Sequence, residues 1–231
     1  MTQETLADQV YRKVAERMPL APLEGFDDIK TIITPDGREV GTFKAFKSDK
    51  VQKFSMARFS LAPGMNYTNA TLKPTYDYNI PRFSFNYMAM GDKIQFDVDL
   101  YPAVDLVIRQ DYIDKYYELL TDRYLNAKKD PCFDWKVSDR SWVRVSASPY
   151  FFMSAAGMDC ADKVHNLIFS YLDVALKIFD EEEKVSPEET KQIEYRTQYI
   201  IRMLIEREPE RHLLEKAFGK ELTERLAHAM V

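Results

Sequence analysis

Residues 81–103 contain two segments of alternating polar and apolar residues, joined at Gly91-Asp92, and this pattern limits the folds open to the chain. In the second segment Asp97 and Asp99 alternate with apolar residues, so polar and apolar side chains would occupy opposite faces of a strand. Two such segments on either side of a short glycine-containing turn predict a β-hairpin. This hairpin in turn predicts an antiparallel sheet with one face against an apolar core.

Two further hairpins are predicted earlier in the chain. Residues 29–46 hold β-branched runs on both sides of a Pro-Asp-Gly turn, and residues 54–74 are broken at Pro63-Gly64. Strands that follow one another as hairpins, without a helix between them, favour an α+β layered domain over a parallel α/β sheet. A further strand or strand pair is predicted over residues 141–157.

Apolar residues at helical spacing predict helices that would pack on this sheet. The predicted helices cover residues 3–18, 105–127, 158–184, 189–210 and 211–231, with a charged linker over 180–189 and an interruption at Pro209. The chain has 231 residues, 45% of them hydrophobic, which is enough apolar material for one domain or at most two. Its 14 Phe and 14 Tyr residues suit either an aromatic core or a pocket for a large flat ligand.

The charge pattern limits the partners. A net charge of −5 is not that of a nucleic-acid-binding protein, so no nucleic-acid partner is expected. A local run of Lys44, Lys47, Lys50 and Lys53 is either a solvated face or a surface that docks an acidic partner. No window approaches the roughly 18 apolar residues of a membrane span, and the N-terminus lacks the apolar region of a signal peptide. We therefore expect a cytoplasmic protein that has no membrane partner.

Most familiar chemical motifs are missing from the sequence. Its two cysteines, Cys132 and Cys160, form no CxxC pair, and its three histidines are scattered. Neither a disulfide framework nor a Cys- or His-based metal site is therefore expected. There is also no GxGxxG, Walker-type loop or GxSxG elbow. The residues alone thus predict an aromatic-rich α+β domain whose strands carry polar side chains.

One stretch, NATLKPTYDYNIPRFSFNYM at residues 69–88, places an asparagine, Asn86, between apolar neighbours on a predicted strand. It resembles the signature of the ferredoxin-dependent bilin reductases. That signature runs from a His or Asn through an apolar strand and a Pro to Leu/Ile-Pro-x-Phe-Gly-x-Asp. Asn69 and Asn86 stand at the family's spacing between its two central polar residues. A second block, LEKAFG at 214–219, is similar to the C-terminal block of the phycocyanobilin-forming branch.

The resemblance implies a fold and a chemistry. It implies one bilin reductase domain over residues 1–231, built as a three-layer α/β/α sandwich with a central antiparallel sheet. The open-chain tetrapyrrole biliverdin IXα would bind between the sheet and the C-terminal helices. The resemblance further implies that the protein uses no flavin or nicotinamide. Electrons arrive singly from reduced 2Fe–2S ferredoxin, and the protein supplies protons to bilin radicals.

The resemblance also implies catalytic positions, and this chain departs from the family at two of them. The family places one Asp on the sheet, where this chain has Asn86, and one Asp on a C-terminal helix, where it has Glu208. Asn69 stands at the position of the central histidine of the phycocyanobilin branch, as in branches that form phycoerythrobilin. Since an amide releases no proton at useful pH, we expect bilin reduction to stall in this protein and Asn86→Asp to accelerate it.

Asn86 has four interpretations. It is a natural residue, with water or Glu208 as the proton source; it is an engineered replacement of Asp; it belongs to a protein that binds bilin without reducing it; or it is a structural amide bonded to backbone. The flat surface for the bilin is expected around Phe83, Phe85 and Tyr87. Arg58, Arg140 and Arg144 are candidates for pairing with the bilin propionates, with surface positions as the alternative.

The most specific expectation is a compact, phage- or bacterial-type member of the family that reduces biliverdin by four electrons to phycoerythrobilin. The alternative is a bilin-binding or catalytically impaired variant, in which Asn86 has replaced the acid of the sheet. The expected partners are biliverdin and ferredoxin, and the expected state is a monomer.

Overall fold

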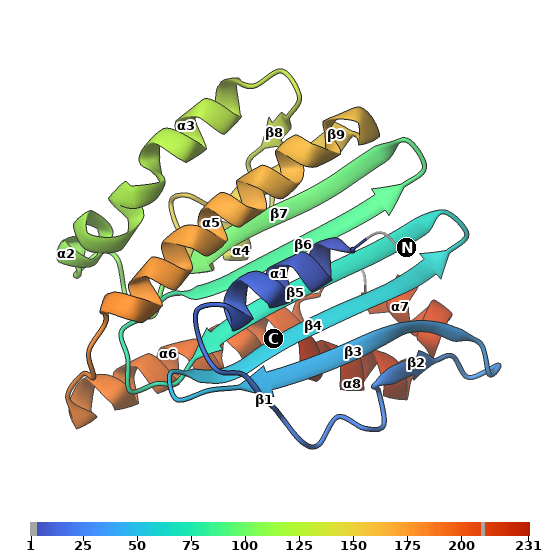
Figure 1. Ribbon diagram of the computed structural model, residues 1–231, viewed down its shortest axis with the longest axis horizontal. Helices are drawn as coiled ribbons and strands as arrows, with labels where there is room; N and C mark the ends of the chain where they lie inside the picture. The colour runs from blue at the N-terminus through green and yellow to red at the C-terminus, as the bar shows by residue number, and fades with distance from the viewer. Residues whose placement is uncertain (1–3, 209–210) are drawn as a thin grey trace.

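The computed structural model describes residues 4–208 and 211–231. Within these residues one sheet of nine strands runs through the molecule, with neighbouring strands antiparallel and in the order β1-β3-β4-β5-β6-β7-β9-β8 (Figure 1). The short strand β2 pairs with β3 beside this path. The strands are β1 Ala21–Pro22, β2 Thr31–Ile33, β3 Glu39–Lys47, β4 Val51–Ala62, β5 Met65–Pro74, β6 Arg82–Met90, β7 Lys93–Tyr101, β8 Asp134–Lys136 and β9 Phe152–Gly157.

The predicted hairpins are confirmed. β2 pairs with β3, β4 with β5, and β6 with β7, each across the turn that the sequence indicates. Gly91 in the last of these turns has φ +60°, a conformation that glycine adopts without the steric cost of a Cβ atom. The sheet therefore grows from local pairings along the chain, and its middle strands β5, β6 and β7 lie side by side.

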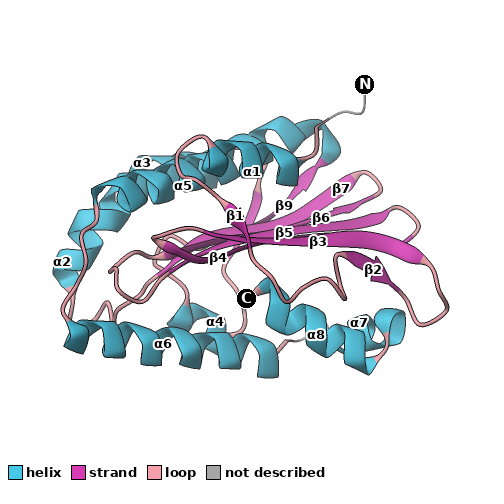
Figure 2. Cartoon of the chain, turned by 60° about the horizontal axis from the view of Figure 1, so that its bottom comes forward, coloured by secondary structure: helices cyan, strands magenta, loops and turns pink. Residues whose placement is uncertain are grey.

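Helices cover both faces of the sheet (Figure 2). On one face lie α1 Leu6–Ala15, α5 Ala161–Glu181 and the helical segment that contains α2 Gln110–Tyr112 and α3 Thr121–Lys129. On the other face lie α4 Ser141–Ser146, α6 Pro187–Glu206, α7 Arg211–Phe218 and α8 Lys220–Met230. The predicted three-layer α/β/α sandwich with a central antiparallel sheet is confirmed.

Three local predictions need correction. The helix predicted over 105–127 begins at Gln110 and passes through a π-helical turn, Ile113–Tyr117, and a 3₁₀ turn, Glu118–Leu120, before α3. The strand predicted over 141–157 is β9 only in its second half, because residues 141–146 form helix α4. Its β-branched residues favour a strand, but tertiary contacts override such weak preferences. The predicted interruption at Pro209 lies outside the described residues.

The C-terminal helices α7 and α8 are anchored on one side of the sheet. The stretch predicted as one helix over 211–231 is divided at Gly219, whose φ is +76°. α7 and α8 then pack on β3 and β4 through a small apolar cluster, in which the ring of Phe218 meets that of Phe59 edge-on at 5.2 Å. Because this cluster anchors the helices at the side of the sheet, they extend over the polar residues of the middle strands.

The prediction that excluded a disulfide is wrong. Cys132, in the segment before β8, and Cys160, in the turn before α5, form a disulfide with their Cα atoms 5.9 Å apart. Their spacing along the chain does not reveal this pairing, because the two cysteines meet only when β8 and α5 are placed by the fold.

Candidate active site

A cavity lies between the middle of the sheet and the C-terminal helices, and its volume is about 650 Å³ including space open to solvent. The sheet contributes alternate residues of β5, β6 and β7, and the opposite wall comes from the end of α6, from α7 and α8 and from the chain end. The lining residues are Tyr67, Asn69, Thr71, Arg82, Ser84, Asn86, Tyr101, Leu204, Ile205, Glu208, Leu214, Ala227, Met230 and Val231. The three predicted catalytic residues, Asn69, Asn86 and Glu208, are thus brought together here.

Strand pairing places the central polar residues in one row. Asn69 on β5 lies directly opposite Asn86 on β6, and Asn86 lies directly opposite Asp97 on β7. Residues directly opposite each other on neighbouring strands point to the same face of the sheet. The row Asn69–Asn86–Asp97 therefore presents two amides and one carboxyl group to the same side.

Hydrogen bonds connect this row and satisfy the Asn86 amide. Asn86 Oδ1 accepts from the Tyr67 hydroxyl at 2.5 Å and from Asn69 Nδ2 at 3.0 Å. Asn86 Nδ2 donates to both carboxyl oxygens of Asp97, at 2.9 and 3.2 Å. The Asn86 amide thus has side-chain partners on both neighbouring strands, and its Nδ2 group holds the Asp97 carboxyl in place.

Asp97 has the most useful acid–base properties in the row. Burial raises its pKa to about 7, the bond from Asn86 opposes this shift, and the negative charges of Asp99 and Glu208 add to it. Burial also raises the pKa of Asp99 to about 6, although this carboxyl accepts bonds from the Ser148 backbone and hydroxyl. Asp99 therefore fastens the segment after α4, whereas Asp97 is an acid able to exchange a proton near neutral pH.

Glu208 lies on the other side of the cavity from this row. The resemblance places its position on a C-terminal helix, but α6 ends at Glu206 and Glu208 follows in the connection to α7. Its side chain is half-buried and lines the cavity. Since its charge contributes to the raised pKa of Asp97, the two carboxyl groups influence each other across the cavity.

A second cavity, of about 690 Å³, adjoins the first along the sheet. Both are lined by Tyr67 and Asn86, and the second is also lined by Asp97 and by residues of β8 and β9 that include Lys136 and Met153. The two hollows together offer an elongated site whose floor is the sheet. Such a site suits a large flat ligand, and the Asn69–Asn86–Asp97 row lies at its middle.

The aromatic residues predicted to line the site lie on the opposite face of the sheet. Phe83 and Phe85 are fully buried in the core on the α5 side, and the ring of Tyr87 lies 5.5 Å from that of His165 on α5. Side chains of a strand alternate between faces, and all three rings are an odd number of residues from Asn86, so they cannot share its side. The structure thus does not bring these three rings together with the predicted catalytic residues, and we do not retain them in the site.

The predicted arginines are also not gathered at the cavities. Arg58 is exposed and lies directly opposite Thr68, one step from Asn69 and therefore on the other face of the sheet. Arg140 and Arg144, at α4, are exposed and line neither cavity. Arg144 Nη1 instead donates to the Ser138 carbonyl at 2.6 Å.

The predicted lysine run does not form one surface. Lys50 Nζ donates to the Phe179 and Glu182 carbonyls, each at 2.7 Å, at the end of α5. Lys53 Nζ donates to the Ala229 carbonyl at 2.8 Å and so fastens the end of α8 to β4. Only Lys44 and Lys47 of the run are exposed. Two of the four lysines thus hold helices on the two faces of the sheet.

Several cavity residues were missed by sequence reasoning, among them Tyr67, Arg82 and Tyr101, while Asp97 was expected beside the pocket and considered only as an alternative acid. All of them share the alternation of Asn69 and Asn86 on the middle strands. Applying that alternation strictly from Asn86 along β6, and then across the hairpin, would have found Arg82 and Asp97.

Within the residues that the structure describes, no group of three or more His, Cys, Asp or Glu side chains is arranged to hold a metal ion. In the same residues no helix is long and apolar enough to span a membrane.

Comparison with known proteins identifies the family. The sequence matches the family described as ferredoxin-dependent bilin reductase over residues 7–231, while no curated protein sequence matches it. The fold is similar to that of phytochromobilin synthase from tomato, solved in complex with biliverdin. The TM-score is 0.86 at 16% sequence identity, over 96% of this chain and 79% of the tomato chain. With a family match that spans nearly the whole chain, this protein belongs to the ferredoxin-dependent bilin reductases and is an oxidoreductase.

Proposed function

We propose that this protein reduces biliverdin IXα to phycoerythrobilin in the cavity under the C-terminal helices, with electrons from reduced ferredoxin. The observation that carries the proposal is the Asn69–Asn86–Asp97 row, which sets a carboxyl group with a pKa of about 7 beside a site for a flat ligand. The similar tomato enzyme is solved with biliverdin, which supports the same substrate class here. The protein would act as one domain and as a cytoplasmic monomer.

The reaction joins single electrons to single protons. An electron from ferredoxin makes the conjugated bilin a radical anion, which is more basic than the parent molecule. A proton from the protein then neutralises it, and a second electron and a second proton complete a two-electron reduction. Two such rounds, which consume four electrons and four protons, convert biliverdin to phycoerythrobilin. The protein must therefore hold acids that are protonated near neutral pH and are refilled from water.

Asp97 is the donor that fits this requirement on the sheet. It stands directly beside Asn86, where the family resemblance places an Asp, and its pKa of about 7 keeps a large fraction protonated at neutral pH. Asn86 would orient the Asp97 carboxyl through the two bonds from its amide. Replacing the acid at 86 by an amide then moves the proton source by one strand and does not remove it.

Asn69 and Glu208 have supporting roles in the proposal. Asn69 donates to Asn86 and to the Phe85 carbonyl, while its own Oδ1 is buried without a hydrogen-bond partner among the described residues. An acceptor of this kind suits a pyrrole N–H of the bilin. Glu208, on the opposite wall, would supply a proton to the other side of the bilin.

Anaerobic incubation with biliverdin IXα and reduced ferredoxin tests the proposal. Biliverdin should shift its red absorption band on binding and then disappear, and chromatography should identify phycoerythrobilin as the product. Stopped-flow absorbance should resolve transient radical species. A different phycobilin would correct the product alone, whereas no band shift and no thermal stabilisation by biliverdin would contradict the whole proposal.

A second candidate is a bilin-binding protein that does not complete the reaction. The observation in its favour is that position 86, at the centre of the row, carries an amide whose bonds are already satisfied. Stable binding of biliverdin with no product after addition of reduced ferredoxin would select this function. Accumulation of a radical or a partly reduced bilin would identify a catalytically impaired enzyme.

A further inference from the structure

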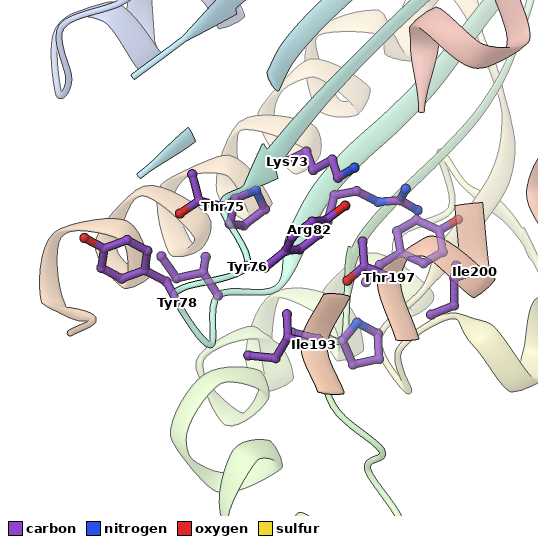
Figure 3. A pocket seen from close by; sticks show the side chains of 13 residues that line it. Lys73, Thr75, Tyr76, Tyr78, Arg82, Ile193, Thr197 and Ile200 are labelled. Carbon is purple, nitrogen blue, oxygen red and sulfur yellow. The ribbon is translucent and has the colours of Figure 1, made fainter. Parts of the chain in front are cut away.

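A smaller hollow, of about 370 Å³ including space open to solvent, continues from the active-site cavity towards the middle of α6. The two share Arg82 and Tyr101 as lining residues, so they follow one another along the same face of the sheet. Figure 3 shows Lys73, at the end of β5, and Arg82, at the start of β6, with their side chains extending side by side and their nitrogen atoms near each other in this cavity. Two cations thus meet at one end of the proposed bilin site.

Arg82 is buried without an ion pair. Only 5% of Arg82 is exposed, and its Nη1 has no hydrogen-bond partner in the described part of the chain. The guanidinium lies 4.6 Å from the centre of the Tyr101 ring, a cation–π contact that leaves its N–H groups available. Asp99 attracts this charge through space, but its carboxyl group is engaged with Ser148. A buried charge in this state is costly unless a ligand completes it.

Lys73 increases the positive charge at the same place. The charge of Glu194 acts on Lys73 through space, as that of Asp99 acts on Arg82, but neither carboxyl group forms an ion pair with its cation in the described part of the chain. The ammonium group lies 5.2 Å from the centre of the Tyr76 ring. Burial and the nearby charge of Arg82 lower the pKa of Lys73 to about 8. An anion bound between the two cations would relieve both the burial and the repulsion.

We propose that Arg82 and Lys73 form a subsite for a carboxylate of the tetrapyrrole, one of its propionate groups. This inference rests on the proposed function. Arg82 and Asn86 are four residues apart on one face of β6, which corresponds to about 13 Å along a strand. A ligand of four linked pyrrole-type rings over the Asn69–Asn86–Asp97 row extends over a comparable length. A guanidinium beside an ammonium recognises a carboxylate through charge-assisted hydrogen bonds.

The subsite would fix the direction in which the bilin lies in the site. A propionate held at this end sets which pyrrole rings lie over Asp97 and which lie towards Met153 in the second cavity. Arg82 and Lys73 would thus be substrate-binding residues that determine which bond of the bilin receives the proton. The Arg58, Arg140 and Arg144 side chains have no comparable place in the cavities.

The test compares biliverdin with biliverdin dimethyl ester, in which both propionates are neutral. Dissociation constants are measured by absorbance for the unchanged protein, for Arg82→Met and for Lys73→Met. The unchanged protein should bind biliverdin about 10- to 100-fold more tightly than the diester. Arg82→Met should bind both ligands with the weaker affinity, and Lys73→Met should lose part of the difference. Arg202→Met is the matched control, because Arg202 makes a similar contact with the Tyr199 ring on α6 and lines none of these cavities.

A second measurement separates binding from a structural role. If Arg82 serves a carboxylate, Arg82→Met should leave the melting temperature of the ligand-free protein equal or higher, since it removes a buried unpaired charge. A structural arginine would instead lower the melting temperature and weaken both ligands equally. If Arg82→Met does not fold, Arg82→Lys and Lys73→Met decide the question through the same pair of ligands.

The possible outcomes are distinguishable. Failure of the unchanged protein to bind either ligand would overturn the proposed function. Equal affinity for biliverdin and its diester, or a full difference retained in Arg82→Met, would overturn the subsite and leave the function standing. Competition of millimolar acetate with biliverdin but not with the diester would locate the effect at the carboxylate.

Discussion

The two faces of the central sheet are built from the same strands, but their properties are opposite. On the α5 side, Phe85 and Val98 lie in a continuous apolar core and are fully buried. On the side of α6, α7 and α8, the next residues along the same strands are Asn86 and Asp97, which are half-buried beside cavities. Each middle strand therefore contributes to the apolar core with one set of residues and to the proposed site with the other.

The two faces of the sheet differ in how burial affects the free energy of folding. Burying a large apolar side chain contributes about 1.5–3 kcal/mol, and the α5 face collects many such contributions. The opposite face holds Arg82, Asp97 and Asp99. Burial lowers the pKa of Arg82 and raises the pKa values of Asp97 and Asp99, so it disfavours the charged form of each group. One face thus stabilises the fold, while the other holds groups in the protonation states that the proposed proton transfer would need.

The sharpest way to test this division is Asp97→Asn. We expect the rate of bilin reduction to fall by about 10²- to 10⁴-fold, the usual contribution of a general acid, with biliverdin affinity nearly unchanged. Stopped-flow absorbance with reduced ferredoxin should show a bilin radical that persists. The control is Asp92→Asn, at an exposed position in the turn of the same hairpin. Equal turnover in both variants would mean that the proton comes from elsewhere.

The opposite pattern is expected from Phe85→Ala on the α5 face. Loss of this ring should destabilise the protein by about 3–5 kcal/mol, because it removes apolar burial and leaves a cavity. Urea unfolding measures the change, and the neighbouring variant Ser84→Ala, on the cavity side, should cost far less. The fraction of Phe85→Ala that remains folded should reduce biliverdin normally. A large loss of reduction without a loss of stability would return this ring to the site.

Asn86→Asp tests the cavity side of the sheet by adding a second carboxyl group beside Asp97. It creates two carboxyl groups side by side, which cannot both ionise easily, so the upper pKa of the pair should exceed that of Asp97 alone. We expect faster full reduction and a fall in rate that begins about one pH unit higher. A pH–rate profile from pH 6 to 9 measures both changes. An unchanged profile would identify Asn86 as a structural amide.

The smallest effect concerns the stability of the ligand-free protein. The pKa of Asp97 is about 7 in the folded protein and roughly 3.9 when unfolded, so the folded state binds more protons between these values. The free energy of unfolding should therefore decrease as pH rises from about 4 to 7. Asp97→Asn should flatten this decrease and raise the melting temperature at pH 8 by a few degrees. The same slope in both proteins would show that this carboxyl does not cause it.

Much of the fold was predictable because its strands form local hairpins. Turn residues such as Gly91 and the alternation around Asp97 predicted the middle of the sheet, and periodicity predicted α1, α5 and α6. α4 was not predictable, since the β-branched residues of 141–146 favour a strand and a helix forms only in its tertiary setting.

The candidate site was predicted in part. Family spacing pointed to Asn69, Asn86 and Glu208, which meet at one cavity. The neighbouring aromatic residues were assigned to the wrong face, although strand alternation already separates Phe85 from Asn86.

The hairpins, the polar and apolar faces of each strand and the family can all be read from the amino-acid sequence, because they depend on residues close together or on a pattern along the chain. The raised pKa of Asp97, about 7, and the place of Lys73 and Arg82 at the end of the site depend instead on tertiary packing. The disulfide between Cys132 and Cys160 depends on the same packing. Proton affinity, charge repulsion and disulfide pairing depend on distances and burial, and these exist only after segments far apart in sequence have packed together.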